Sequence, residues 1–358
     1  MKVAIISWES FLGSRIGGWI QATKTVDGLA RIGWATDHLL LHSDGTVTLP
    51  DKTIAGHWKE ICDRYDILHA IPPIPSSYFR KIGLPRKAQL LASTIFWRSP
   101  TYTKVVQRES GKFSFKAAIN DFAAQCGVRT ILAYADYDML LPNSQAEIIQ
   151  FKKYCRYKAS ALFRAVPNGI DPVPEWVESL PRPVCVPKED YLLYPGIFTY
   201  RKNQLNFIKA MAKCKYPIVF MGGGMGDGIY YDRCRAAAPS NMIFLGHLEH
   251  GSKEFYGVMK HARVACLASN CETPGIALLE AAALGVRPTI TVEGGTPEYY
   301  REDASYLDPL SSSSIKKAVD EAWGKGSLTM EQQNRYREMT WGKTAQITVS
   351  AYRELLGK

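Results

Sequence analysis

Residues 270–285 read NCETPGIALLEAAALG, and this stretch decides how the chain around it is built. The apolar run before it, Arg263–Ser269 (RVACLAS), predicts a buried strand. The segment from Ile276 to Leu284 is rich in alanine and leucine and predicts a helix. A buried strand, a short turn and a helix form the repeating unit of a parallel sheet that helices cover on both faces.

The turn between this strand and this helix carries an acid and a glycine. Gly275 allows a backbone to approach a ligand closely, and the amides of Gly275, Ile276 and Ala277 are helix N-terminal donors that suit a phosphate group. Glu280 lies about one helical turn further along, where its carboxylate can accept two hydrogen bonds from a ribose diol. Glu272 faces whatever is attached beyond the phosphates. The alternative is that Glu272 is a surface turn residue and Glu280 a solvated helix position.

Short apolar runs alternate with amphipathic segments along the rest of the chain. The predicted strands are VAIIS (3–7), HLLLH (38–42), DILHA (66–70), YLLYPG (191–196), IVFMGG (218–223) and MIFLGH (242–247). The segments at 203–214 and 252–262 predict helices between them. This alternation predicts an α/β fold with doubly wound parallel sheets, in which ligands bind outside the carboxyl ends of the strands.

The length of 358 residues is too great for one compact core, so two domains are expected. The proline-rich stretch 171–187 breaks the alternation and is the best candidate for a linker. We therefore predict a first domain over residues 1–185 and a second over 186–340, with a cleft between them.

Composition favours a globular enzyme of the cytoplasm. Hydrophobic residues make up 46% and charged residues 22%, and no apolar run approaches the ~20 residues of a membrane span. The N-terminal stretch reads as a first strand that meets a charge at Glu9, not as a signal peptide. Eight cysteines occur without a C-x-x-C pair, so we expect reduced thiols and neither a zinc cluster nor a disulfide framework.

The formal net charge of +10 is concentrated between Arg80 and Lys116, where nine basic residues accompany one acid, Glu109. Aromatic residues are interspersed among them. One interpretation is a solvated basic face, and the other is a surface for anionic lipid or for a phosphorylated acceptor. Nucleic acid is not expected as a partner, because no binding motif accompanies the charge. The basic residues are Arg80, Lys81, Arg86, Lys87, Arg98, Lys104, Arg108, Lys112 and Lys116.

Several stretches, taken in order, resemble the family-4 retaining glycosyltransferases, the glycosyl transferases of group 1. CETPGIALLEAAALG (271–285) and TVEGGTPEYY (291–300) resemble that family's E-x7-E region and G-G-x-P-E turn. The further stretches are RIGGWIQATKTVDGLARIG (15–33), LLPNSQAEIIQF (140–151), AVPNGID (165–171), YPGIFTYRKNQLNFIKAM (194–211), IVFMGGG (218–224), MIFLGHL (242–248) and TWGKTAQITVSAYRELL (340–356).

This resemblance implies the GT-B fold, in which two Rossmann-like doubly wound domains face a central cleft. The first domain, 1–185, would then be the acceptor side and the second, 186–340, would bind the nucleotide sugar. Residues 341–358 would form a C-terminal helix that crosses back to the first domain.

The implied activity is retaining transfer of a sugar, expected to be a hexose, from a nucleotide-diphosphate donor to an acceptor hydroxyl. The acceptor would be a sugar, a lipid-linked glycan or another hydroxyl compound, as in polysaccharide or glycolipid synthesis. The resemblance implies no cofactor and no metal. It also implies a cytoplasmic protein, located peripherally at an anionic membrane if the 80–116 stretch binds lipid.

The resemblance also assigns roles to single residues. Glu272 matches the acid beside the donor sugar, and Lys202 the lysine that balances the diphosphate. The remaining matches are Gly17 and Gly18 for the loop that approaches the diphosphate, Gly275, Ile276 and Ala277 for the phosphate-binding helix start, Glu280 for the ribose, Leu248 for the base through its backbone, and Glu298 for a structural role.

The chain departs from the family pattern at three points. Ile197 follows Gly196 where the family has arginine, and Arg201 is the candidate replacement. The family's active-site histidine has no counterpart in STIFWRSP (93–100); His69 either faces the cleft or makes only local hydrogen bonds. The E-T-P-G-I-A sequence, in place of E-G-F-G-L-P, keeps Gly275 and alters the sugar pocket.

Other functions were weighed against this one. Asp136 and Asp138 form a D-x-D pair, which binds metal in another class of glycosyltransferases, but we interpret it as part of the family's strand before N-S. The glycine-rich run at 221–231 suggests a dinucleotide-binding loop. No frame in it satisfies G-x-G-x-x-G, so an oxidoreductase is not expected. A sugar-nucleotide 2-epimerase of the same architecture and a non-catalytic nucleotide-sugar-binding homologue remain the alternatives. Product analysis separates them: an epimerase isomerises the nucleotide sugar without acceptor, and a non-catalytic protein binds it without turnover.

Overall fold

The computed structural model describes residues 1–12, 17–98, 126, 128–129, 131–224 and 228–357. These residues form two compact units. The first contains the described residues of the ranges 1–97, 126–169 and 339–357, and the second contains the described residues of the range 170–338. The domain boundaries expected after residues 185 and 340 stay predictions.

An eight-stranded sheet with the order β4-β3-β2-β1-β5-β6-β7-β8 forms the centre of the first unit. The six strands β2, β1, β5, β6, β7 and β8 are parallel to their neighbours in this order. Strands β3 and β4 add an antiparallel edge beside β2. The strands are β1 (Val3–Trp8), β2 (Thr36–Leu41), β3 (Thr46–Thr48), β4 (Ile54–His57), β5 (Ile67–Ala70), β6 (Gln89–Thr94), β7 (Met139–Pro142) and β8 (Leu162–Phe163). The helices are η1 (Glu9–Phe11), α1 (Gly17–Arg31), α2 (Trp58–Ile61), η2 (Cys62–Arg64), α3 (Ser76–Ile82), α6 (Gln145–Tyr154) and α14 (Trp341–Leu355).

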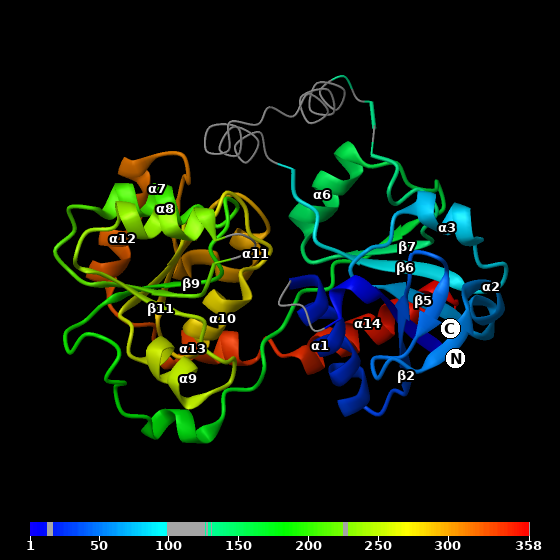
Figure 1. Cartoon of the computed structure of the whole chain (residues 1–358), viewed down its shortest axis with the longest axis horizontal. Coiled ribbons are helices and arrows are strands. Elements are labelled where there is room, and N and C mark those ends of the chain that lie inside the picture. Colours follow the sequence, from blue (N-terminus) through cyan, green and yellow to red (C-terminus); the bar gives the residue numbers. More distant parts are fainter. Residues whose placement is uncertain (13–16, 99–125, 127, 130, 225–227, 358) are drawn as a thin grey trace. The chain divides into compact units, whose positions relative to one another are not determined.

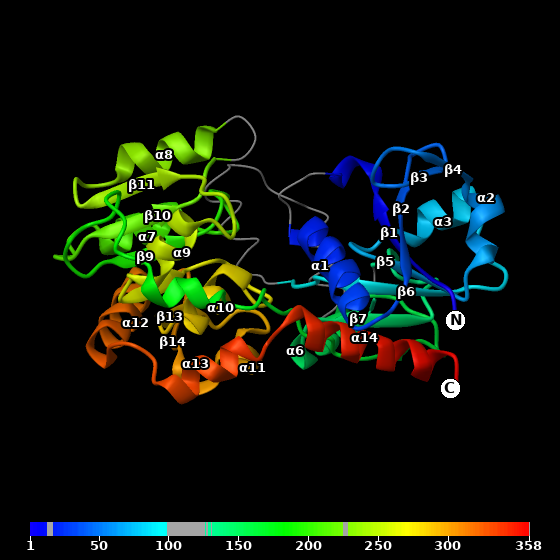
Figure 2. The ribbon, with the colours of Figure 1, turned by 90° about the horizontal axis from the view of Figure 1, so that it is seen from below.

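Alternate side chains of β1 serve two different cores. Val3 and Ile5 pack with residues of α1 and α14, whereas Ala4 and Ile6 pack with residues of α2, α3 and α6. This two-residue period is the one that a strand covered on both faces requires. The C-terminal helix α14 runs beside α1 (Figures 1 and 2).

The second unit is built on a six-stranded, wholly parallel sheet with the order β11-β10-β9-β12-β13-β14. Figure 1 shows α7, α8 and α12 on one face of this sheet and α9 and α10 on the other. The strands are β9 (Leu192–Pro195), β10 (Ile218–Met221), β11 (Met242–Gly246), β12 (Val264–Leu267), β13 (Arg287–Thr291) and β14 (Ser305–Leu307). The helices are η3 (Glu175–Ser179), α7 (Gln204–Met211), α8 (Ile229–Ala237), α9 (Lys253–Lys260), α10 (Ile276–Ala283), α11 (Thr296–Tyr300), η4 (Arg301–Asp303), α12 (Ser312–Lys325) and α13 (Met330–Arg337).

Every strand that the sequence predicted is present in these two sheets. Strands β9, β10 and β12 are buried at every residue, which explains why they read as continuous apolar runs rather than as alternating ones. The predicted α/β class with doubly wound parallel sheets is confirmed. Among the described residues, each helix is too short or too polar to cross a bilayer.

The proline-rich stretch is held on the second unit by side chains of α9 and the residues after it. Lys260 Nζ donates to the carbonyl of Val177 at 2.9 Å, and His261 Nε2 donates to the carbonyl of Leu180 at 3.0 Å. The ring of Trp176 meets that of Tyr256 edge-on, with centroids 5.6 Å apart. Because these bonds fix the stretch to one unit, the division of the chain falls before it, between Gly169 and Ile170.

Candidate functional site

The loops that follow β9, β11, β12 and β13 lie at one edge of the second sheet, because its strands are all parallel. They contain residues 196–203, 247–252, 268–275 and 292–295. All the site residues that the sequence assigned to the second domain lie on these loops or on α10. This carboxyl edge is where ligands bind in doubly wound sheets.

Two cations share the carboxylate of Glu272. Lys202 Nζ lies 2.6 Å from Glu272 Oε1, and Arg201 Nη1 lies 3.3 Å from the same oxygen. Arg201 also donates to the carbonyl of Cys271 at 3.1 Å. The Glu272 side chain is only 4% exposed. Since two positive charges meet one negative charge, the cluster carries an excess of positive charge that suits an anionic ligand.

The charges around Glu272 also fix its protonation state. Burial alone would raise the pKa of Glu272, but Lys202 and Arg201 outweigh burial and lower this pKa to about 2. Burial lowers the pKa of Lys202, which Glu272 opposes and the charge of Arg201 reinforces. Glu272 is therefore ionised at neutral pH and acts as a hydrogen-bond acceptor, not as a proton donor.

The loop after β13 holds the backbone of Glu272 in place. The amide of Glu272 donates to the carbonyl of Glu293 at 3.0 Å, and the amide of Gly295 donates to the carbonyl of Glu272 at 3.1 Å. A Cβ added at Gly294 would lie 1.9 Å from the carbonyl oxygen of Glu272. The G-G-x-P-E turn thus positions the backbone of Glu272. Glu298 itself is an exposed residue in the first turn of α11.

Gly275 is the N-cap of α10, with a left-handed backbone (φ +81°) that favours glycine. A Cβ at this position would lie 3.0 Å from Leu267 Cδ1 and 3.6 Å from Glu272 Oε2. The amides of Ile276 and Ala277 precede the first intrahelical bond, from the amide of Leu278 to the carbonyl of Gly275. These amides lie at the positive end of the helix dipole, beside the charged cluster.

Glu280 lies in the second turn of α10, and its side chain is 8% exposed. His250 Nε2 lies 2.6 Å from Glu280 Oε1. Sequence reasoning missed His250, because 30 residues separate the two and no spacing motif connects them. Leu248, expected to read the base, is half-buried on the same loop.

The sequence-predicted residues Gly17 and Gly18 belong to the first unit, where they begin α1. A Cβ at Gly18 would lie 3.1 Å from the side chain of Pro72. Residues 13–16, just before them, lie outside the described residues.

His69 is fully buried in the first unit. Its Nδ1 lies 2.8 Å from the hydroxyl of Tyr352 and its Nε2 lies 2.8 Å from the hydroxyl of Ser93. Burial lowers the pKa of His69 to about 3, so the ring is neutral. The local hydrogen-bonding interpretation of His69 is confirmed, and it does not replace the family's active-site histidine.

The N-S-x-x-E landmark is also structural in its contacts. Glu147 is fully buried and accepts hydrogen bonds from Thr94 Oγ1 at 2.7 Å and from the amide of Phe96 at 2.6 Å. Gln21 Nε2 donates to the side chains of Asn143 and Asn168 at 3.2 and 2.9 Å. Gln21 therefore ties the N-S-x-x-E stretch to the P-N-G-I-D stretch.

The D-x-D pair is occupied by ion pairs. Asp136 pairs with Arg80 at 2.7 Å, and Asp138 pairs with Lys158 at 2.6 Å. Arg80 is thus engaged within the first unit. Of the other basic residues in the 80–116 stretch, Lys104, Arg108, Lys112 and Lys116 lie outside the described residues.

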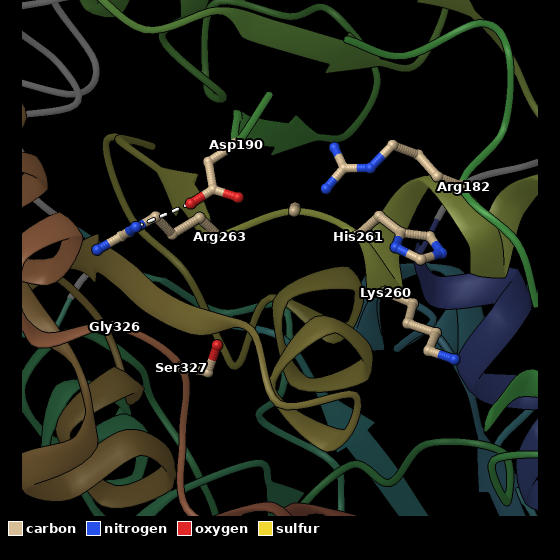
Figure 3. Close-up of a pocket in the computed structure, with 8 residues that line it drawn as sticks. Arg182, Asp190, Lys260, His261, Arg263, Gly326 and Ser327 are labelled. Atoms are coloured by element: carbon tan, nitrogen blue, oxygen red, sulfur yellow. Dashed lines mark hydrogen bonds and ion pairs between the residues drawn. The ribbon is translucent and has the colours of Figure 1, made fainter. Parts of the chain in front are cut away.

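A separate pocket of about 320 Å³ lies in the second unit, near the amino ends of β9 and β12, and Figure 3 shows the residues that line it. Arg182, Lys260, His261 and Arg263 line it together with one acid, Asp190. Arg263 Nη1 pairs with Asp190 at 2.8 Å, and Arg182 donates to main-chain carbonyls. Since Lys260 and His261 also bond to carbonyls, these side chains fasten the proline-rich stretch, which accounts for the cluster without a ligand.

The second unit of the chain is similar in sequence to known proteins. Residues 181–339 match the model of the family described as glycosyl transferases group 1. Over 156 residues the chain is 28% identical to O-antigen chain mannosyltransferase C of Escherichia coli. That match covers 42% of this chain and only 40% of the relative.

Three solved structures share the fold over nearly the whole chain. Sucrose-phosphate synthase from Thermosynechococcus elongatus has a TM-score of 0.72 at 16% identity, with 100% of both chains covered. HepE of Anabaena, in complex with UDP and glucose, has 0.64 at 13%, with 100% of both chains covered. WaaG, a glycosyltransferase of lipopolysaccharide biosynthesis, has 0.60 at 15%, with 99% of this chain and 100% of WaaG covered. The expected GT-B fold is confirmed.

Proposed function

We propose that this chain, whose residues 181–339 match the model of the group 1 glycosyltransferases, moves a sugar from a nucleotide diphosphate to an acceptor hydroxyl with retention of configuration and without a metal. The observation that carries the proposal is the cluster of Arg201, Lys202 and Glu272 beside the start of α10. Transfer from such a donor requires stabilisation of the departing diphosphate, and fixed charges and dipoles usually supply the largest catalytic contribution.

In this proposal the two cations and the amides of Ile276 and Ala277 hold the diphosphate. Binding of the diphosphate draws Arg201 and Lys202 from the carboxylate of Glu272 toward the phosphate oxygens. The ionised carboxylate, whose pKa is lowered to about 2 by Lys202 and Arg201 against the effect of burial, then accepts hydrogen bonds from the sugar hydroxyls. Gly275 keeps the helix start open to the ligand because it has no Cβ.

Arg201 takes the place of the arginine that the family has at Ile197. The support is that both residues lie on the loop after β9 and that the Arg201 guanidinium reaches Glu272 Oε1 at 3.3 Å. Ile197 is half-buried on that loop and has no charge to offer a phosphate. Glu280, nearly buried on α10, is proposed to accept from the ribose hydroxyls, and the backbone of Leu248 to meet the base.

The names of the relatives suggest the substrate class. The Escherichia coli relative is a mannosyltransferase of O-antigen chains and WaaG acts in lipopolysaccharide biosynthesis, so we propose a nucleotide-diphosphate hexose, such as one that carries mannose, as the donor and a glycan, lipid-linked or free, as the acceptor. The 80–116 stretch would then bring the enzyme to the cytoplasmic face of an anionic membrane.

The test is a screen of UDP- and GDP-hexoses for thermal stabilisation and for donor hydrolysis, with and without oligosaccharide acceptors. We expect one nucleotide class to stabilise the protein and its sugar to be released or transferred with the anomeric configuration kept. Isomerisation of the donor without acceptor would identify an epimerase instead. Binding without any turnover, across donors and acceptors, would identify a non-catalytic homologue.

A further inference from the structure

We propose that His250 is a positioning residue that orients the carboxylate of Glu280 and thereby sets the affinity of the site for the ribose of the donor. The inference rests on the proposed function, because it concerns the same nucleotide site. No role for His250 follows from the sequence motifs, and it is the contact with Glu280 that points to one.

The contact joins a loop and a helix that follow strands far apart in the sheet. His250 lies between β11 and α9, whereas Glu280 lies on α10 after β12. Strands β10 and β9 separate β11 from β12 in the sheet. The 2.6 Å distance from His250 Nε2 to Glu280 Oε1 therefore bridges the carboxyl edge of the sheet.

The direction of the hydrogen bond follows from the chemistry of the two groups. An ionised carboxylate only accepts, so the proton of this bond lies on Nε2 of the imidazole. Glu280 has lost most of its water, with 8% of its side chain exposed, whereas the His250 side chain is 48% exposed. A charge-assisted hydrogen bond in this water-poor environment strongly restricts rotation of the Glu280 carboxylate.

Because His250 occupies Oε1, the other carboxylate oxygen of Glu280, Oε2, is the acceptor that a ligand hydroxyl can use. Among the described residues, no hydrogen bond to Glu280 Oε2 competes with a ligand hydroxyl. The ring of His250 is held in turn by Phe255, whose ring meets it edge-on with centroids 4.8 Å apart. Phe255 is buried on α9, so the imidazole is supported from its own side and Glu280 is oriented before the ligand arrives.

The variants follow from this geometry. His250→Ala removes the donor, and His250→Gln keeps an amide N–H at about the place of Nε2. His247→Ala is the matched control, because His247 is an exposed histidine on the same loop. Glu280→Ala shows the effect of losing the carboxylate itself. Thermal unfolding of each variant establishes that it folds.

Binding of UDP, GDP, their 2′-deoxy forms and inorganic pyrophosphate is measured by calorimetry, and donor hydrolysis is measured under steady state. We expect His250→Ala to weaken binding of the preferred ribonucleotide roughly tenfold, consistent with loss of a hydrogen bond to a charged group. The deoxy form and pyrophosphate should change by less than about twofold. KM for the donor should rise while kcat stays within about twofold, and His250→Gln should restore the wild-type KM.

Equal effects of His250→Ala on the ribo and deoxy forms, or a failure of His250→Gln to restore KM, would overturn the inference. The inference would also be overturned if His250→Ala kept the wild-type ribonucleotide affinity while Glu280→Ala bound weakly. In that case the proposed function would still stand. A wild-type protein that binds no nucleoside diphosphate would overturn both.

Discussion

Gly294 stands directly against the carbonyl of Glu272, so close that the smallest side chain does not fit between them. A Cβ at Gly294 would lie 1.9 Å from that oxygen and 3.0 Å from the Glu272 amide nitrogen. Glu272, at the carboxyl edge of the second sheet, is therefore positioned by a neighbouring loop that contacts it through backbone atoms. We therefore expect any side chain at position 294 to displace the backbone of Glu272.

Gly294→Ala should cost stability and activity together. The backbone at Gly294 has φ +127°, which L side chains rarely adopt, and the added methyl clashes with main chain. We expect a loss of at least about 2 kcal/mol in the free energy of unfolding and a large fall in donor hydrolysis. Gly324→Ala is the control: it lies near the end of α12, nothing approaches its added Cβ within 4 Å, and alanine favours helix. Equal free energies of unfolding of the two variants in urea would contradict the role of Gly294 in positioning Glu272.

Lys202→Ala should lower turnover by roughly 100- to 1000-fold, the cost of removing one fixed donor to a developing anion. Arg201→Ala should also lower kcat, and the double variant should lose less than the product of the two effects because both cations serve one group. Lys209→Ala, an exposed lysine on α7, is the control in steady-state assays. Full activity in both single variants and in the double variant would place the diphosphate elsewhere.

Acidification should destabilise the first unit through His69. Burial lowers the pKa of His69 from 6.5 to about 3, so the unfolded chain binds a proton before the folded one does. Its contribution to stability is complete above pH 6.5 and is lost as the pH falls from 6.5 toward 3, by up to about 1.4 kcal/mol per pH unit. Urea unfolding between pH 7 and pH 5 should show a shallower decline in His69→Gln than in the wild type. Parallel declines would show that His69 is not the titrating group.

Transfer should continue in excess EDTA, because the proposed diphosphate site consists of Arg201, Lys202 and backbone amides. Asp136→Asn and Asp138→Asn should leave kcat nearly unchanged, since their carboxylates already pair with Arg80 and Lys158. Loss of activity in EDTA that Mg²⁺ or Mn²⁺ restores would reopen the D-x-D pair as a metal site.

Anionic vesicles should retain the protein at low salt and release it at high salt. Lys81, Arg86 and Lys87 are exposed, and each basic residue near such a surface contributes about 1 kcal/mol. Changing these three to Gln should weaken co-sedimentation and leave hydrolysis of a free donor intact. The same change at Lys209, Lys213 and Lys215, exposed residues of the second unit, is the control. A wild type that ignores anionic vesicles at low salt would favour a soluble acceptor.

The sequence indicated the strands and the carboxyl-edge loops because burial imposes apolar runs and because glycines mark close approaches of the backbone. It placed Glu272 and Gly275 at this edge on the same grounds, whereas Lys202 was assigned through the resemblance to the glycosyltransferase family. It did not indicate that Arg201 and Lys202 converge on a single oxygen of Glu272, since that depends on side-chain rotamers. It missed His250, whose partner Glu280 lies 30 residues away on α10.

The proline-rich stretch shows the same limit. Prolines indicate that regular structure ends, and they do not tell which unit the stretch packs on. Lys260 and His261 determine this through bonds to main-chain carbonyls, and such bonds leave no spacing pattern in the sequence. Similarly, nothing in the basic stretch indicates that Arg80 has a partner 56 residues away at Asp136.

The close approach of Gly169 and Thr340 has a consequence for how this chain can be rearranged. A Cβ at Gly169 would lie 2.3 Å from the carbonyl carbon of Thr340, so the chain leaves the first unit and returns to it at one place. Everything between, Ile170–Glu338, is a single continuous insert. A recombination or a gene fusion that joins at these two neighbouring points would therefore replace the whole second unit and keep α1 and α14, which pack on each other, in the same host chain.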